Sequence, residues 1–114
     1  MKRSEVWLIN LDPTVGAEIR KTRPAIIVND DGLGILPLRI IVPVTDWKDQ
    51  YAVAPWMVKI DPDSINNLTK PSGADCFQVR SVSQDRFVKK LGQVENGKMA
   101  EIEQALAIVL KIRN

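Results

Sequence analysis

The sequence predicts a small, mainly β domain of the α+β class, in which a strongly bent antiparallel sheet closes into a small barrel with a C-terminal helix packed on it. Two observations carry this prediction. Most of the chain consists of short apolar segments separated by Pro, Gly, Asn and Asp. Near the C-terminus, the apolar spacing changes from strand-like to helical. The length of 114 residues favours one domain spanning residues 1–114.

The first two strands are predicted on either side of a polar loop. Residues 6–11 (VWLINL) are rich in β-formers and end at a turn-forming Asp-Pro pair. Residues 14–22 are polar, include a glycine and are predicted as a loop. Pro24 has no N–H and suits the first position of a strand, so residues 25–28 are predicted as the second strand.

The middle of the chain predicts two further strands, each marked by a proline. Residues 29–32 (NDDG) have turn chemistry, and residues 38–44 (LRIIVPV) follow as a third strand. Pro43 predicts an edge position or a bulge near the end of that strand. Residues 52–60 (AVAPWMVKI) are predicted as a fourth strand, which Pro55 interrupts.

The last third of the chain predicts a loop, two short strands and the helix. Residues 61–75 are mostly loop, residues 76–79 (CFQV) a short strand, and residues 86–93 (RFVKKLGQ) another strand. Asn96 is the predicted N-cap of the helix. One apolar helix face recurs at spacings of three and four residues, with Met99, Ile102, Leu106, Val109 and Leu110 as its members.

The composition contains no histidine and one cysteine, Cys76. This excludes Ser-His-Asp and Cys-His catalysis, a two-histidine ribonuclease, zinc sites built on Cys or His, and an intrachain disulfide. A metal site would need oxygen ligands only, and no metal or cofactor is expected. Because Cys76 lies in an apolar segment without a histidine partner, we expect an inert thiol in the core.

Charge and hydropathy bear on location more than on function. The formal net charge of +2 is too small to argue for nucleic-acid binding. No apolar run approaches the ~20 residues that cross a membrane. The N-terminus is basic and then apolar, but Glu5, Asn10 and Asp12 interrupt the run and no cleavage site follows, so no signal peptide is predicted. Together with the single cysteine, these features predict a cytoplasmic protein without membrane contact.

The first candidate site is the charged loop before Pro24. It contains Glu18, Arg20, Lys21, Thr22 and Arg23 between two strands. A residue before proline is restrained to extended backbone, and a guanidinium presents a fixed fork of donors that matches a phosphate. A solvated loop would carry the same charges, so the loop taken alone leaves both interpretations open.

Two further candidates lie where predicted strands end. A hydroxyl, a carboxylate, an aromatic ring and a cation fall within residues 45–48 (TDWK), and polar residues end the segment 78–81 (QVRS). A turn after an edge strand explains the first equally well, with Thr45 bonding its own backbone. The other large aromatic residues, Trp7, Trp56 and Phe77, are expected in the core.

The order of these segments resembles a known family. The stretch 5–29 (EVWLINLDPTVGAEIRKTRPAIIVN) contains a W-x-x-x-L-x-P-x-x-G-x-E core followed by R-P and an apolar strand. IVPVT at 41–45, QVRSV at 78–82 and the closing strand and helix follow in order. The set resembles the MazF/PemK/Kid toxins, the endoribonucleases of toxin–antitoxin pairs. Each step alone is uninformative, but the ordered set covers nearly the whole chain.

The resemblance implies an SH3-like barrel, a homodimer, and sequence-selective, metal-independent cleavage of single-stranded RNA such as mRNA. It also implies inhibition by a small acidic, MazE-like antitoxin whose C-terminal part enters the RNA groove. In the MazF branch the catalytic pair matches Arg23 and Thr45, and Glu18 and Gln78 match residues near the RNA. The remaining expected RNA contacts are Ala17, Thr22, Trp47, Arg80 and Ser81.

One departure concerns proton transfer. The Kid branch assigns acid–base roles to an Arg-x-Asp group just before the matching glutamine, and these positions are Asp75 and Phe77 here. That assignment therefore does not carry over. We expect attack by the ribose 2′-OH on the adjacent phosphate, with Arg23 holding the phosphate and Thr45 orienting one of its oxygens. Glu18 is one candidate for the base, whose identity the sequence leaves open.

Two alternatives to a ribonuclease fit the same architecture. A CcdB-like toxin would poison gyrase through its terminal helix without nuclease activity. A plain SH3-like binding module would bind a partner without chemistry. The R-P, V-P-x-T and Q-V-R-S steps favour the ribonuclease, because a binding module would not need Arg23 together with Thr45.

Overall fold

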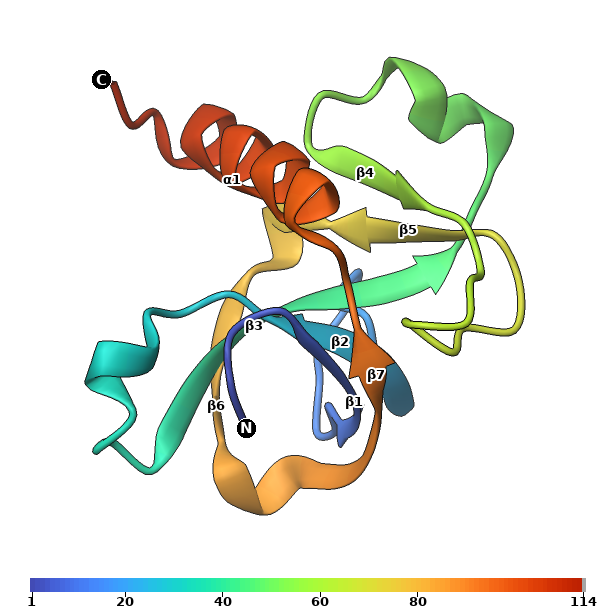
Figure 1. Cartoon of the computed structure of the whole chain (residues 1–114). Coiled ribbons are helices and arrows are strands. Elements are labelled where there is room, and N and C mark those ends of the chain that lie inside the picture. The colour runs from blue at the N-terminus through green and yellow to red at the C-terminus, as the bar shows by residue number, and fades with distance from the viewer. Residues whose placement is uncertain (114) are drawn as a thin grey trace.

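Seven strands and one long helix form the fold in the computed structural model, which describes residues 1–113 (Figure 1). All strand pairs are antiparallel. The elements are β1 (Glu5–Asn10), β2 (Thr22–Ile27), β3 (Leu38–Asp46), β4 (Met57–Ile60), β5 (Ser72–Asp75), β6 (Arg80–Ser83), β7 (Phe87–Gln93) and α1 (Asn96–Leu110). This confirms the mainly β class with a C-terminal helix.

The sheet is bent but, over the described residues, it does not close into a barrel. Its order is β4-β5-β3-β2-β1-β7, and β6 pairs with the first half of β3. One edge of β3 therefore changes partner, from β6 at Leu38–Ile41 to β5 at Val44–Asp46. Pro43 falls at this change, where the missing N–H interrupts no ladder. The edge position or bulge predicted at Pro43 is wrong, because β3 lies inside the sheet and its register with β2 runs through Pro43 without a shift.

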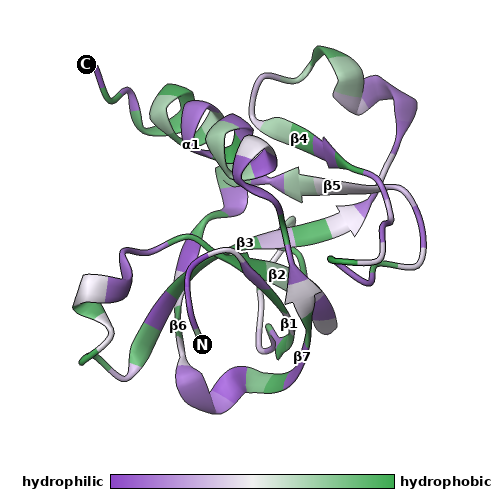
Figure 2. Cartoon of the chain, in the orientation of Figure 1, coloured by the Kyte–Doolittle hydropathy of each residue, from purple (hydrophilic) through white to green (hydrophobic). Residues whose placement is uncertain are grey.

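The core consists of two clusters, one on each face of the sheet. Alternation along β2 sends Ile26 toward α1 and Ala25 and Ile27 to the opposite face. The helix contributes Met99, Ile102 and Ala105 to the first cluster. Burying each aliphatic side chain of this size stabilises the fold by roughly 1.5–3 kcal/mol. Figure 2 shows hydrophobic residues along the central strands and hydrophilic ones at the turn before β7.

Two predicted strands are wrong. In the segment 52–60 only Met57–Ile60 is a strand, and Asp49–Val53 forms a short 3-10 helix. The segment 76–79 begins as a 3-10 turn over Cys76–Gln78, while the strand lies earlier, inside the predicted loop. Asp75 accounts for the second error, because its carboxylate accepts a bond from the Phe77 N–H and turns the chain out of the ladder.

The C-terminal helix is confirmed, with one correction at its start. Asn96 is the first helical residue, and Glu95 occupies the N-cap position without a side-chain capping bond. The helix ends at Lys111, which adopts the left-handed conformation. Leu110, expected on the apolar face, is exposed. No helix within residues 1–113 is long and apolar enough to cross a membrane.

Side chains expected in the core fall into two groups. Cys76 is fully buried, and burial together with the nearby Asp75 carboxylate raises the pKa of its thiol to about 12, which confirms an inert thiol. Trp7 is half-buried and packs edge-to-face on Phe87. The prediction is wrong for Trp56 and Phe77, which are 41% and 67% exposed and contact each other.

Candidate functional site

Arg23 and Thr45 lie on neighbouring strands near the same end of the sheet. The ladder between β2 and β3 ends where Ala25 pairs with Pro43, and Arg23 and Thr45 lie two residues beyond that pair, one on each strand. Both residues border a pocket of about 330 Å³, which Thr22 also lines. The structure therefore brings together the two residues that the sequence predicts as a pair.

The side chains of this pair are free to meet an anion. Arg23 pairs with Ile9 of β1, and its Nε donates to the carbonyl of Arg20 at 3.4 Å. Within residues 1–113 the Arg23 guanidinium has no carboxylate partner, and the Thr45 hydroxyl makes no hydrogen bond. Both residues are half-buried. A half-buried, unpaired guanidinium beside a free hydroxyl suits a phosphate.

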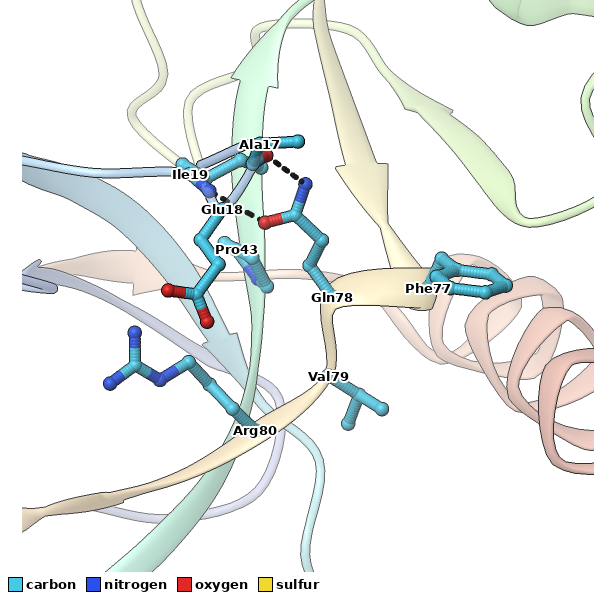
Figure 3. Close-up of a pocket in the computed structure, with 8 residues that line it drawn as sticks. All are labelled: Ala17, Glu18, Ile19, Pro43, Phe77, Gln78, Val79 and Arg80. Carbon is cyan, nitrogen blue, oxygen red and sulfur yellow. Dashed lines mark hydrogen bonds between the residues drawn. The ribbon is translucent and has the colours of Figure 1, made fainter. Parts of the chain in front are cut away.

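A second pocket, of about 500 Å³, lies between the loop Ala17–Ile19 and the segment Phe77–Arg80, with Pro43 in its wall (Figure 3). Arg80 pairs with Ile41 and so points to the same side of β3 as Pro43 and Thr45. We call this side of the sheet, which carries Arg23, Thr45, Pro43 and Arg80, the site face. The second pocket borders it, whereas the first is also lined by Pro24 and Val44, which alternate to the opposite side.

Gln78 joins its own segment to the loop across this pocket. Its Oε1 accepts a hydrogen bond from the Ile19 N–H at 2.6 Å, and its Nε2 donates to the Ala17 carbonyl and to Asp75 Oδ2, each at 3.3 Å (Figure 3). The Ile19 side chain packs against the core cluster on that face. The loop is therefore fixed by its backbone and by its side chain.

Glu18 contributes to the structure of its own loop. Its Oε1 accepts a bond from the Val15 N–H at 2.6 Å, and the Glu18 N–H donates back to the Val15 carbonyl at 3.3 Å. In Figure 3 the Glu18 carboxylate extends to the same side as the guanidinium of Arg80. Arg80 in turn donates to the carbonyl of Leu11, where the loop begins.

Trp47 lies at the Thr45 end of the site face. A side chain on Gly73, which pairs with Thr45, would meet the Trp47 ring at 3.3 Å. The Trp47 ring packs edge-to-face on Tyr51, and the ammonium of Lys59 lies 5.4 Å from its centroid. The indole is half-buried, and its contacts with Tyr51 and Lys59 hold it in place. A ring held in this way can serve as a planar stacking surface.

One predicted contact does not belong with the others. Ser81 pairs with Ile40, one residue out of phase with Arg80, and therefore projects to the opposite side of the sheet. It is exposed there. The structure thus gathers Ala17, Glu18, Gln78 and Arg80 in one pocket and Arg23 and Thr45 in the other, with Trp47 beside Thr45. Thr22 also lines the second of these, but as the neighbour of Arg23 in β2 it projects to the opposite side of the sheet.

Sequence reasoning missed Asp75 and Lys59 as members of this region. Burial raises the pKa of Asp75, although hydrogen bonds from Phe77 and Gln78 act against the rise. Asp75 was the last residue of a predicted loop, and no sequence pattern marked it as part of the site. Lys59 could have been found, because it stands between the buried Val58 and Ile60 and so must point outward from β4. No group of three or more Cys, Asp or Glu side chains suited to a metal ion occurs within residues 1–113.

Comparisons with known proteins converge on one family. A family model described as the PemK-like, MazF-like toxin of type II toxin-antitoxin systems matches residues 2–110. The chain is 32% identical to Endoribonuclease MazF of Staphylococcus epidermidis, over 100% of this chain and 94% of that protein. It is 29% identical to Endoribonuclease MazF9 of Mycobacterium tuberculosis, over 98% of each.

A solved structure shows the same fold. It is an endoribonuclease in complex with its cognate antitoxin from a mycobacterial species, with a TM-score of 0.78 and 21% sequence identity. The match covers 100% of this chain and 98% of the mycobacterial chain. The path of the backbone is therefore common to both proteins from end to end.

Proposed function

The chain belongs to the PemK-like, MazF-like family of toxins of type II toxin–antitoxin systems, and from this premise we propose that it is an endoribonuclease that cleaves single-stranded RNA, mRNA included. The observation that carries the proposal is that Thr45 lines the same pocket as Arg23, whose guanidinium has no carboxylate partner within residues 1–113. Cleavage is sequence-selective, needs no metal ion and takes place in the cytoplasm.

The proposed reaction uses a nucleophile that the RNA itself supplies. The ribose 2′-oxygen forms a bond to the adjacent phosphorus while the bond from phosphorus to the 5′-oxygen breaks. The 2′-OH proton passes to a base, and the leaving 5′-oxygen takes up a proton. The products are a 2′,3′-cyclic phosphate and a 5′-hydroxyl. Arg23 binds the non-bridging phosphate oxygens, and Thr45 donates to one of them, so charge gained in the transition state is stabilised.

Arg23 acts as a charge rather than as a proton donor, because a guanidinium does not lose its proton in proteins. Removing one donor to a developing oxyanion typically costs about 10²–10³ in rate. Glu18 uses one carboxylate oxygen to hold its loop, which assigns it a positioning role.

Base recognition is assigned to the rest of the site face. Single-stranded RNA is read by bases that stack on planar side chains and bond through their edges. Trp47 offers the stacking surface next to Thr45, with Lys59 as a cation for the backbone. The pocket between Ala17–Ile19 and Gln78 offers backbone and amide groups to base edges, and Arg80 adds a second guanidinium.

We propose two protein partners for the same chain. The first is an acidic, MazE-like antitoxin whose carboxylates compete with RNA for Arg23 and Arg80. The mycobacterial structure that shares the fold is itself a complex with an antitoxin.

The second partner is another copy of this chain. The exposed apolar residues from Leu33 to Ile40 supply surface for such a homodimer, and light scattering at micromolar concentration tests it.

A single assay tests the proposed activity. Purified protein is incubated with single-stranded RNA in excess EDTA, and the fragment ends are analysed. We expect a limited set of fragments with cyclic-phosphate and 5′-hydroxyl ends. RNA that stays intact contradicts the proposal, and inhibition of gyrase in the same preparation would then identify a gyrase poison.

A further inference from the structure

Asp75 stands at the end of β5 with both carboxylate oxygens engaged. Oδ1 accepts a hydrogen bond from the Phe77 N–H at 3.1 Å, and Oδ2 accepts one from Gln78 Nε2 at 3.3 Å. Asp75 also pairs with Met57 of β4, so its backbone is fixed by the sheet. The carboxylate is therefore held in a fixed position, in contact with the Gln78 amide.

A carboxylate fixes the orientation of an amide in a way that a neutral side chain does not. An ionised Asp only accepts hydrogen bonds, so it must face the NH₂ side of Gln78. The Oε1 side of Gln78 is then directed at Ile19, whose N–H is a donor. In the series of hydrogen bonds from the Phe77 N–H through Asp75 and Gln78 to the Ile19 N–H, one orientation of the Gln78 amide thus satisfies every group.

Gln78 is the acceptor on which the Ile19 N–H depends, since within residues 1–113 no other hydrogen bond satisfies this donor. A half-buried donor without an acceptor costs about 1–3 kcal/mol. Reversing the Gln78 amide would leave Ile19 unpaired and would set the Gln78 NH₂ against it. The direction of one amide therefore decides whether Ala17–Ile19 stays in place.

We propose that Asp75 is a positioning residue for RNA recognition, which acts through Gln78 to hold the loop Ala17–Ile19 as a fixed wall of the pocket on the site face. This inference rests on the proposed ribonuclease function. It assigns to Asp75 a part in the RNA KM rather than in the chemical step, because no contact links Asp75 to Arg23 or Thr45 in residues 1–113.

The burial of Asp75 agrees with this role. Burial raises the pKa of the carboxyl, so the folded state disfavours the charged form. At neutral pH the ionised carboxylate therefore lowers stability while it orients the amide.

Three variants separate the donor and acceptor roles. In Asp75→Asn, the new side-chain oxygen still accepts the hydrogen bond from the Phe77 N–H, so the new NH₂ group faces Gln78. Either the contact between positions 75 and 78 or the bond from Ile19 to Gln78 is then lost. In Gln78→Glu, a second carboxylate faces Asp75. In the double variant Asp75→Asn/Gln78→Glu, the polarity is reversed and the net charge equals that of the wild type. One carboxylate oxygen at position 78 accepts from position 75 and the other from Ile19, while the Ala17 carbonyl loses the donor that Gln78 Nε2 supplied.

The readouts are hydrogen exchange of the Ile19 amide by NMR and the KM and kcat for RNA cleavage. We expect Asp75→Asn to raise Ile19 exchange and KM each by about fivefold to tenfold, as for one lost hydrogen bond, with kcat changed by less than about twofold. Gln78→Glu should have a larger effect. The double variant should return Ile19 exchange to within about threefold of the wild type.

The outcomes distinguish this inference from the proposed function. Ile19 exchange that stays unchanged in Asp75→Asn, or a double variant no better than Gln78→Glu, overturns the role of Asp75. So does a fall in kcat with KM unchanged. If the wild-type protein cleaves no RNA but Ile19 exchange in the variants follows expectation, the proposed ribonuclease function is refuted. Asp75 then still positions the loop through Gln78, but it has no role in RNA recognition.

Discussion

The two ends of the site face are built by different means. At one end, Arg23 and Thr45 stand on the neighbouring strands β2 and β3, two residues beyond the last pair of the ladder between them. At the other end, Ala17–Ile19 belong to a loop, and the amide of Gln78 holds them in place from about sixty positions further along the chain. The groups assigned to chemistry are thus fixed by backbone pairing, and those assigned to recognition by side-chain bonds.

This difference suggests how such a scaffold can vary. A loop held by a few hydrogen bonds can change its sequence, and with it the bases it reads, without disturbing the strands. A catalytic pair on central strands stays in place while the loop changes. The predictions below test whether the two ends are as independent as this division implies.

The largest effect is expected at the strand end. Arg23→Ala should lower the rate of RNA cleavage by about 10²–10³, because it removes the charge that binds the transition state. Denaturant unfolding should be nearly unchanged, since the guanidinium has no ion-pair partner within residues 1–113. Arg23→Lys is the matched control: it keeps the charge but loses the fork, and should recover part of the rate. Wild-type rates in Arg23→Ala would refute the catalytic assignment.

A smaller effect is expected where RNA stacks. Trp47→Ala should weaken binding of a non-cleavable RNA analogue by about 1–3 kcal/mol, the usual contribution of one stacked base. Fluorescence anisotropy measures this affinity. Trp47→Phe, which retains a planar ring, should lose less. If both variants bind RNA like the wild type, Trp47 serves only to pack Tyr51.

Stability should respond to a residue outside the site face. Burial by itself would raise the pKa of Glu5, but hydrogen bonds from Trp7, Lys2 and Lys90 outweigh burial and lower it to about 2. Because the pKa is lower in the folded state, ionised Glu5 stabilises the fold above pH ~4.5, and this stabilisation is lost as the pH falls toward 2.

Glu5→Gln should therefore lower the free energy of unfolding by about 1–2 kcal/mol at pH 7, with allowance for the exposed partner Lys90. The difference from the wild type should shrink below pH 4. Urea titrations at pH 7 and pH 3 measure it. Cleavage per folded molecule should not change, since the hydrogen-bond and ion-pair partners of Glu5 within residues 1–113 all lie outside the site face.

Thr45→Val should give an effect of about 1 kcal/mol, a loss of roughly fivefold to tenfold in kcat/KM, as expected for one hydrogen bond to the phosphate. Valine keeps the size and the β-branching of threonine, so the strand is preserved. A loss as large as that of Arg23→Ala would mean that the hydroxyl takes part in proton transfer. That result would identify the missing acid or base.

The smallest effect is expected at Ser81. Ser81→Ala should change RNA affinity by less than about 0.5 kcal/mol, the range of surface substitutions away from special features. Its neighbour Arg80, one residue away on the other side of β6, should matter more, and Arg80→Gln in the same binding assay makes the comparison. Equal losses at both positions would contradict the assignment of the site face.

Much of the fold could be predicted because each strand carries a local signal. The apolar runs of β2 and β3 and the helical spacing of α1 were enough, whereas the change of partner along β3 at Pro43 was not predicted. The segment Cys76–Gln78 could not be predicted. Its residue types favour a strand, but the Asp75 side chain takes the N–H that a strand would use.

The residues of the candidate site also fall into two groups, those that the sequence predicts and those that it does not. Arg23 and Thr45 could be found from their motifs, and their places on neighbouring strands explain why both line one pocket. Ser81 was expected with Arg80 because the two are adjacent in sequence, yet adjacent residues of a strand project to opposite faces. Asp75 could not be found, since its importance lies in a contact with Gln78 that only the turn creates.

The bond between Gln78 and Ile19 also sets an order of events during synthesis. The loop Ala17–Ile19 is made early, but the amide that holds it is made about sixty residues later. A chain growing on a ribosome therefore contains Arg23 and the loop long before the recognition pocket can assemble. A polypeptide released before Gln78 would carry the charged loop without the wall that selects RNA. The fold therefore delays assembly of the proposed recognition pocket until most of the chain exists.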